Sequence, residues 1–370
     1  MRNAKRKSLV FTLVFSLLLP AIFAIAPQTA FGITLLHEFA SGADDGRNPF
    51  GSLLLSGSTL YGMTGAGGDN SYGTVFKINT DGTGHTLLRE FAGGTDDGRM
   101  PLGSLTLSGS TLYGMTFYGG DNNRGVVYKV NTDGTGYNHL HEFAGGAYDG
   151  ATPKDSLILS GSTLYGMTNT GGDHNDGVVF KVNTDGTGYG LLHEFAWGAD
   201  DGANPNGSLI LSGSTLYGMT EAGGDHNDGV IFKVNTDGTG YNHLREFTGG
   251  ADDGGGPFGS LILSGSTLYG MTSHGGDDDY GTVFQVNTDG GSYGLLHEFT
   301  GYPEDGRVPC GSLTLSGSTL YGMTYGGGDY NFGVVFALEI PEPSTLLLLA
   351  PALVSFAALL RKKFRGTVEP

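Results

Sequence analysis

Aspartates recur at regular intervals along this chain of 370 residues. One follows each Gly-Gly pair of a recurring loop, and others stand in a recurring Ala-Asp-Asp-Gly segment. Carboxylates beside carbonyl-rich glycine loops suit a hard cation such as calcium, and they also suit the hydroxyl groups of sugars. The competing interpretation is that these aspartates only form turns and solvate the surface. The candidate calcium ligands are Asp69, Asp121, Asp173, Asp225, Asp277 and Asp329.

Aromatic residues stand beside these loops in some copies of the pattern. The two residues after each Gly-Met-Thr differ from copy to copy, whereas the flanking segments barely change. Variation confined to loops on a constant scaffold is typical of a binding surface, although neutral drift gives the same pattern. If the surface binds a saccharide, the flat rings of Phe117, Tyr118 and Tyr325 are the predicted stacking platforms.

No catalytic site is predicted. The chain has no His-Glu-x-x-His or P-loop motif. Repeated carboxylate pairs argue against one acid/base pair, whose two members need different environments. His174 and His226, in two Gly-Gly-Asp loops, are the histidines that a metal would recruit. Four other histidines share a repeat position with two arginines, which predicts an exposed strand face: His37, His141, His193 and His297, with Arg89 and Arg245.

Composition excludes several classes of protein. Glycine accounts for 68 residues, but there is no Gly-X-Y period, so the chain is not collagen. Hydrophobic residues at 38% argue against a disordered glycine-rich chain. The net charge of −18 argues against nucleic acid as a partner. The single cysteine, Cys310, excludes a disulfide framework.

The body of the chain is one unit repeated six times. The segment Leu-Tyr-Gly-Met-Thr returns every 52 residues without an insertion, beginning at Leu60, Leu112, Leu164, Leu216, Leu268 and Leu320. Each unit holds four short runs rich in β-branched and aromatic residues, bounded by turn residues. In the second unit the predicted strands are Leu87–Phe91, Ser104–Ser108, Thr111–Thr116 and Gly125–Asn131.

Six units of four antiparallel strands predict an all-β fold, a six-bladed β-propeller over residues 33–340. The turns place the Ser-Leu-Ile-Leu-Ser run innermost, followed by the Leu-Tyr-Gly-Met-Thr and Val-Val-Phe-Lys-Val runs, with Leu-Leu-His-Glu-Phe outermost. The chain then begins with a lone outer strand, Thr34–Phe39, which we expect to close the ring by pairing with Val334–Leu338. The alternative fold is an open β-solenoid, which would require atypical capping units.

The two ends of the chain have the composition of targeting segments. Residues 1–32 combine a basic start with an apolar run, which predicts a secretory signal peptide; the alternative is a retained anchor. Residues 341–370 begin with Pro341-Glu342-Pro343, continue with an apolar run, Leu346–Leu360, and end in a basic cluster that includes Arg361, Lys362 and Lys363. The apolar run is short for a membrane-spanning helix, and an ordinary tail anchor is the alternative.

The C-terminal segment and the repeated body each resemble a known family. The order of the tail resembles the PEP-CTERM sorting signal, which implies a Gram-negative bacterium, processing by an exosortase-type enzyme and transient anchoring in the inner membrane. The Gly-Met-Thr, Gly-Gly, Gly-Val-Val-Phe-Lys-Val and Leu-His-Glu-Phe pattern resembles the GloVer (Gloeobacter/Verrucomicrobia) tandem repeat. That resemblance implies an exported repeat protein, without an established activity.

We therefore expect an exported protein of the cell surface or extracellular matrix that is not an enzyme. Its predicted role is to bind glycan or exopolysaccharide, or to mediate cell-surface interaction, with no cofactor other than calcium. The alternative is a polysaccharide lyase or hydrolase on the same scaffold, since a fold does not determine function.

Overall fold

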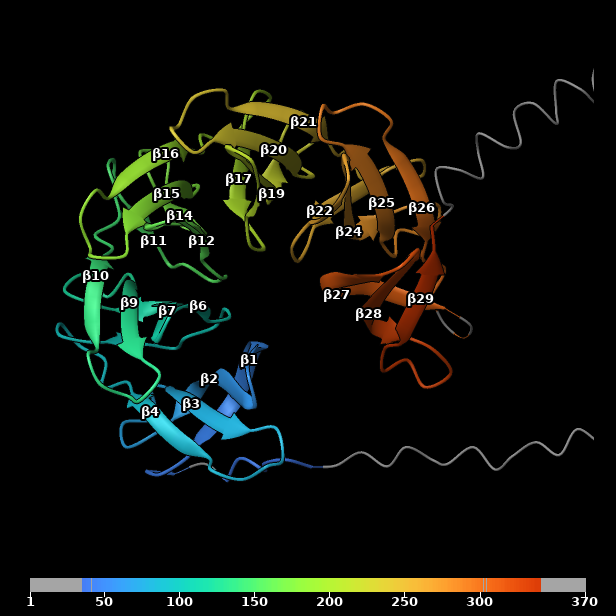
Figure 1. Cartoon of the computed structure of the whole chain (residues 1–370). Coiled ribbons are helices and arrows are strands. Elements are labelled where there is room, and N and C mark those ends of the chain that lie inside the picture. The colour runs from blue at the N-terminus through green and yellow to red at the C-terminus, as the bar shows by residue number, and fades with distance from the viewer. Residues whose placement is uncertain (1–34, 41, 302, 304, 341–370) are drawn as a thin grey trace, which may run out of the picture. The chain divides into compact units, whose positions relative to one another are not determined.

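A computed structural model describes residues 35–40, 42–301, 303 and 305–340. Within these ranges every regular element is a β-strand, so no helix there is long and apolar enough to cross a membrane. The strands form six blades arranged around a central opening, as Figure 1 shows. The prediction of an all-β, six-bladed propeller is confirmed. The predicted signal peptide and sorting segment lie outside the described residues.

Consecutive stretches of the chain form consecutive blades. Blade one has β1 (Gly46–Ser56), β2 (Thr59–Gly67), β3 (Thr74–Asn79) and β4 (Thr86–Glu90). Blade two has β5 (Gly98–Arg99), β6 (Thr106–Ser108), β7 (Thr111–Thr116), β8 (Tyr118–Gly119), β9 (Val126–Asn131) and β10 (Asn138–Glu142). Blade three has β11 (Gly150–Ala151), β12 (Ile158–Ser160), β13 (Thr163–Thr168), β14 (Thr170–Gly171), β15 (Val178–Asn183) and β16 (Gly190–Glu194).

The remaining three blades follow the same plan. Blade four has β17 (Gly202–Pro205), β18 (Ile210–Ser212), β19 (Thr215–Gly223), β20 (Val230–Asn235) and β21 (Asn242–Glu246). Blade five has β22 (Gly254–Pro257), β23 (Ile262–Ser264), β24 (Thr267–Gly275), β25 (Thr282–Asn287) and β26 (Gly294–Glu298). Blade six has β27 (Gly306–Ser316), β28 (Thr319–Gly327) and β29 (Val335–Glu339).

The strand order within a blade is the predicted one. In blade two, neighbouring strands run β6-β7-β9-β10, and every pair is antiparallel. The structure adds a pairing that the sequence did not indicate, because Gly98–Arg99 of β5 pairs with Tyr118–Gly119 of β8. A two-residue pairing is too short to produce a sequence pattern of its own.

The core consists of layers between adjacent blades. Tyr61 and Met63 of blade one pack in one cluster with Leu105, Leu112 and Tyr128 of blade two, and all five are at most 8% exposed. The same layer repeats at the following junctions. Because a strand inside such a layer is covered by a neighbouring blade on both faces, its apolar residues stand at consecutive positions rather than alternate ones. Each buried large side chain contributes about 1.5–3 kcal/mol.

A spiral of serines joins the inner edges of the blades. The backbone N–H of Ser52 donates to the hydroxyl oxygen of Ser104, 52 residues later, at 2.7 Å. Four further bonds repeat this step, from Ser104 to Ser156, Ser156 to Ser208, Ser208 to Ser260 and Ser260 to Ser312. The close approach at Gly207 requires glycine, because a Cβ there would lie only 1.9 Å from the carbonyl oxygen of Gly259. The exact 52-residue repeat is therefore also the repeat of the inter-blade contacts.

The predicted closure of the ring by the N-terminal strand is wrong. Residues 35–40 form no strand, and within the described residues β29 pairs with β28 alone. The segment instead contacts blade one, where Phe39 meets the ring of Phe76 edge-on at 5.3 Å and His37 bonds Asp45. Contacts between residues so close in sequence cost little loop entropy, whereas pairing with β29 would join residues about 300 apart.

The consequence is an uncovered seam between blade six and blade one. Phe50 and Leu53 of blade one are each 55% exposed, although Leu105, the equivalent of Leu53 in blade two, is 5% exposed. On blade six, Met323 and Val335 are 53% and 78% exposed. An apolar pocket of about 240 Å³ lies on the blade-one side and is lined in part by Phe39, Phe50 and Leu53.

Candidate functional site: the loop face and its carboxylate nodes

The Gly-Gly-Asp loops and the inter-blade loops lie on one face of the propeller, which we call the loop face. In blade two the N–H of Gly120 donates to the carbonyl of Asp97 at 3.0 Å, and equivalent bonds hold the two loops together in the other blades. Asn123 has a positive φ of 54° and its side chain accepts the N–H of Gly119, so an Asx residue shapes the turn. The two kinds of loop therefore lie together on the same face.

The six aspartates of the Gly-Gly-Asp loops are all exposed. The backbone N–H of four of them, Asp69, Asp121, Asp225 and Asp277, donates to a glutamate of the outermost strand, which leaves the carboxylate facing solvent. None of the six belongs to a described group of three metal-ligating side chains within reach of one ion. Calcium binding at these loops stays a prediction, in which each loop would bind its own ion.

The three predicted stacking aromatics have different surroundings. Phe117 and Tyr118 pack edge-to-face at 4.5 Å and are only partly exposed, and the guanidinium of Arg99 lies 4.8 Å from the centre of the Tyr118 ring. Tyr325, on blade six, is 78% exposed. Tyr325 therefore offers a free ring, whereas Phe117 and Tyr118 also have packing partners.

The loop face carries further exposed aromatics that sequence reasoning did not single out. They lie within the Gly-Gly-Asp loops and the inter-blade loops themselves: Tyr72, Tyr148, Trp197, Tyr280, Tyr330 and Phe332. Two of them, Tyr330 at 83% and Phe332 at 89%, stand in the same blade-six loop, next to Tyr325. Aromatic residues in these two types of loop were the sequence signal for an exposed aromatic surface, because a loop outside the sheets offers no core position for a large ring.

The aspartate that precedes the last glycine of each inter-blade loop is the centre of a repeated polar node. Asp149 accepts hydrogen bonds from the N–H of Gly150 and Ala144, from the Nε2 of His141 at 3.0 Å, and from the hydroxyl of Tyr189 at 2.5 Å. Partial burial by itself would raise the pKa of Asp149, but these bonds hold the pKa below its ordinary value. The node ties an inter-blade loop to the outermost strand before it and the hairpin after it.

The prediction that the shared histidine and arginine position is an exposed strand face is wrong. The imidazole of His141 stacks on the ring of Tyr189 at 3.5 Å, and Arg89 binds Asp97 at 2.5 Å while its guanidinium lies over Tyr137. Both residue types fit because each presents a flat face to the tyrosine and an N–H to the carboxylate. His174 and His226, the predicted metal-recruiting histidines, belong to no described metal-ligating group.

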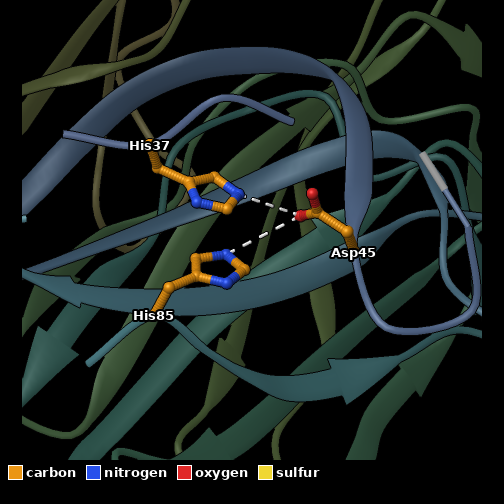
Figure 2. A group of neighbouring side chains, drawn as sticks. All are labelled: His37, Asp45 and His85. Carbon is orange, nitrogen blue, oxygen red and sulfur yellow. Dashed lines mark hydrogen bonds and ion pairs between the residues drawn. The ribbon is translucent and has the colours of Figure 1, made fainter. Parts of the chain in front are cut away.

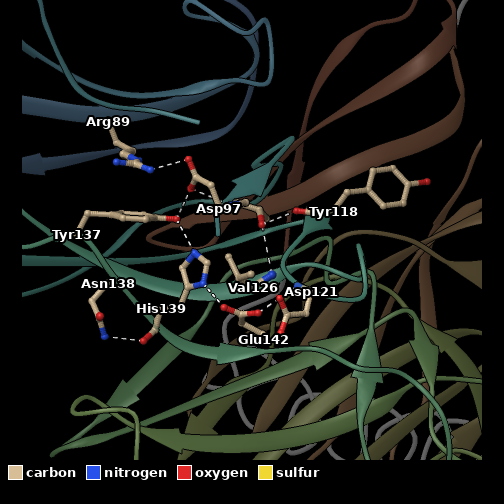
Figure 3. A network of polar contacts seen from close by, with 11 residues as sticks. Arg89, Asp97, Tyr118, Asp121, Val126, Tyr137, Asn138, His139 and Glu142 are labelled. Carbon is tan, nitrogen blue, oxygen red and sulfur yellow. Dashed lines mark hydrogen bonds and ion pairs between the residues drawn. The ribbon is translucent and has the colours of Figure 1, made fainter. Parts of the chain in front are cut away.

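In blade two a chain of bonds connects the buried node to the loop face (Figure 3). The Tyr137 hydroxyl, bound to Asp97 at 2.6 Å, also contacts the Nε2 of His139 at 3.1 Å. The other ring nitrogen of His139 meets Glu142, which in turn accepts the backbone N–H of Asp121 at 3.1 Å. The backbone of the Gly-Gly-Asp loop is thereby connected to Asp97 through the side chains of Glu142, His139 and Tyr137.

The wall of the central opening carries one titratable break in the repeat. Asp155 stands where the other units have glycine, and it lines a cavity of about 670 Å³ together with the serine spiral. Burial raises the pKa of Asp155 to about 6, although the N–H of Gly207 donates to its carboxylate at 3.0 Å. The carboxyl is therefore partly protonated near neutral pH.

Comparison with known structures gives matches of low sequence identity. A nidogen/laminin complex matches with 16% identity and a TM-score of 0.43, covering 72% of this chain and 85% of that chain. A putative TolB from Agrobacterium tumefaciens matches with 13% identity and a TM-score of 0.40, covering 77% and 87%. TolB from Acinetobacter baumannii matches with 14% identity and a TM-score of 0.38, covering 75% and 66%. No curated protein matches the sequence.

The family model of the Gloeobacter/Verrucomicrobia repeat matches three overlapping regions, residues 19–174, 86–262 and 199–350. Together they span the whole body of six blades. The chain therefore belongs to the Gloeobacter/Verrucomicrobia (GloVer) repeat family.

Proposed function

We propose that this protein is a non-enzymatic glycan-binding propeller, exported to the cell surface or extracellular matrix, and that its loop face binds polysaccharide. The observation that carries the proposal is the concentration of exposed aromatic side chains on that one face. Sugar rings stack on flat apolar faces, and their hydroxyls donate to carboxylates such as those of the six exposed loop aspartates. Equivalent loops in successive blades suit a polymer of repeating sugars.

Blade six supplies the sharpest test of this role. Tyr325, Tyr330 and Phe332 are each at least 78% exposed, so replacing all three by alanine removes ring surface with little loss of packing. The matched control is Tyr321→Ala, an exposed tyrosine on β28 at the seam rather than on the loop face. Surface substitutions of this kind change stability by roughly 0.5 kcal/mol each.

The assay is a screen of the full chain against immobilised glycans and soluble polysaccharides, with and without calcium, that scores both binding and cleavage. We expect binding by the native chain and by Tyr321→Ala, and at least a tenfold loss in the triple variant. Unchanged binding in the triple variant would exclude blade six as the site. Release of shortened sugars would replace the binding role with that of a polysaccharide lyase or hydrolase.

The export route is a separate part of the proposal. The apolar and basic composition of residues 1–32 and 341–370 supports secretion, followed by processing of the tail by an exosortase-type enzyme in a Gram-negative cell. Mass spectrometry of the exported protein should find Leu346–Leu360 absent. An intact tail in a cell that makes such an enzyme would contradict this part of the proposal without affecting glycan binding.

A further inference from the structure

The polar node of blade one differs from the others by one residue. In blades two to five, a tyrosine from the hairpin after the node donates its hydroxyl to the central aspartate at 2.5–2.6 Å: Tyr137, Tyr189, Tyr241 and Tyr293. At the equivalent position, 52 residues before Tyr137, stands His85. Figure 2 shows His85 beneath the imidazole of His37, with both rings directed at Asp45.

The replacement leaves a nitrogen without a partner. The Nε2 of His85 lies 3.9 Å from the nearer carboxylate oxygen of Asp45, too far for a hydrogen bond, and it is buried with no partner. The two imidazoles stack with their centres 3.8 Å apart, and the His37 Nε2 lies 3.1 Å from the same oxygen. A buried polar atom with no partner is costly, so something in the native environment is expected to satisfy it.

We propose that His37, Asp45 and His85 bind one divalent transition-metal cation of the zinc class. The three ligand atoms lie within 4.8 Å of one another, and they are the one such group among the residues that the structure describes. Ligand atoms about 2.0–2.1 Å from a tetrahedral ion are roughly 3.3–3.5 Å apart, close to the observed 3.1 and 3.9 Å. The two rings stack with their planes 11° apart, so a shared ion requires both rings to turn until each ring plane contains it.

The donor set selects the class of cation. Two imidazole nitrogens and one carboxylate oxygen suit zinc, cobalt, nickel or copper, whereas calcium and magnesium prefer oxygen ligands alone. Three protein ligands leave a fourth position open, and side-chain exposures of 24%, 15% and 17% for His37, Asp45 and His85 give an ion a path from solvent. The acidic chain also attracts cations to its surface.

Outer contacts already orient the carboxylate. The N–H of Ala40 donates to one oxygen of Asp45 at 2.7 Å, and the N–H of Gly46 donates to the other at 2.8 Å. Such bonds hold a ligand in position and strengthen metal binding. The site is thus prepared in the same way as the tyrosine nodes, with a metal-binding side chain where the others have a phenol.

The test uses the purified full chain without a histidine tag, stripped of metal and titrated with Zn²⁺ by calorimetry and with Co²⁺ by visible absorption. We expect one site in the native chain. His85→Tyr restores the residue of the other blades and should weaken binding at least about 100-fold, because losing even an outer partner of a ligand costs about 10–100-fold. Tyr189→His builds a second His-Asp-His node around Asp149 and should raise the stoichiometry from one to two.

The control is His226→Ala, which removes an exposed histidine of a Gly-Gly-Asp loop and should leave the titration unchanged. Circular dichroism confirms that each variant is folded. Absence of Zn²⁺ binding by the native chain, or undiminished binding by folded His85→Tyr, would overturn the proposal. A folded Tyr189→His variant with a single site would also overturn it, because the exchange of tyrosine for histidine would then not create the site.

Discussion

Each polar node should stabilise the fold strongly through its central aspartate, whereas the adjacent aspartate should contribute little. Asp201 accepts hydrogen bonds from the N–H of Gly202 at 2.8 Å and of Ala196 at 3.0 Å, from Tyr241 at 2.5 Å and from His193 at 3.0 Å. In Asp201→Asn, one oxygen becomes an NH₂ group that faces a donor. Leaving one half-buried donor unpaired costs about 1–3 kcal/mol, and the other bonds lose their charge, so we expect a total of about 3 kcal/mol.

The neighbouring aspartate is a matched control. Asp200 is exposed and makes no side-chain hydrogen bond within the described residues, so Asp200→Asn should leave stability unchanged. With an unfolding entropy of about 2.1 cal/mol/K per residue over about 300 residues, a loss of about 3 kcal/mol lowers the melting temperature by about 5 °C. Differential scanning calorimetry measures both melting temperatures. Equal values for Asp201→Asn and Asp200→Asn would refute the conclusion that the node stabilises the fold.

Three further predictions concern pH and the central opening. Hydrogen bonds hold the pKa of Asp149 and Asp201 below its ordinary value, so these aspartates stabilise the fold above the unfolded pKa of about 3.9. The melting temperature should therefore drop as the pH falls from about 5 to 3. The drop should be less steep in Asp201→Asn, which lacks one of these carboxylates. Ser208→Ala removes the acceptor of one spiral bond and should cost about 1 kcal/mol in denaturant unfolding, whereas Ser52→Ala should cost nothing, since no described donor reaches its hydroxyl. Burial disfavours the charged form of Asp155, so its destabilising effect develops as the pH rises from the unfolded pKa of about 3.9 to about 6 and is constant above that. Asp155→Asn should therefore raise stability at pH 8 by about 1–2 kcal/mol and leave it unchanged at pH 4, and a gain of equal size at both values would contradict the shifted pKa.

The repeat made most of the fold predictable. A period of 52 residues with four β-rich runs determined the blades, and the predicted Thr111–Thr116 strand coincides with β7. The two-residue pairing of β5 with β8 could not be predicted, since it has no periodic pattern.

The predictions that failed required knowledge of which neighbour a side chain contacts. The segment before Ala40 carries the strand pattern, but its side chains bind blade one through His37 and Phe39, and no pattern indicates which of two neighbours a segment contacts. The position shared by His141 and Arg89 was assigned to solvent because both residue types are common on surfaces. In the structure both are held against an aspartate eight residues later in the chain.

In a repeat this regular, a single departure is more informative than the consensus. A consensus residue, such as Tyr189, serves the packing that every blade needs, and it stands in a position where its role repeats around the ring. His85 replaces the tyrosine of the other nodes with an imidazole, the proposed metal ligand, and its Nε2 is buried without a partner among the described residues. Asp155 replaces a glycine with a carboxyl group, and burial raises the pKa of that group. A protein retains a locally unfavourable residue most often where function requires it. The first blade's node and the central opening are therefore the places where this propeller differs from a purely structural ring.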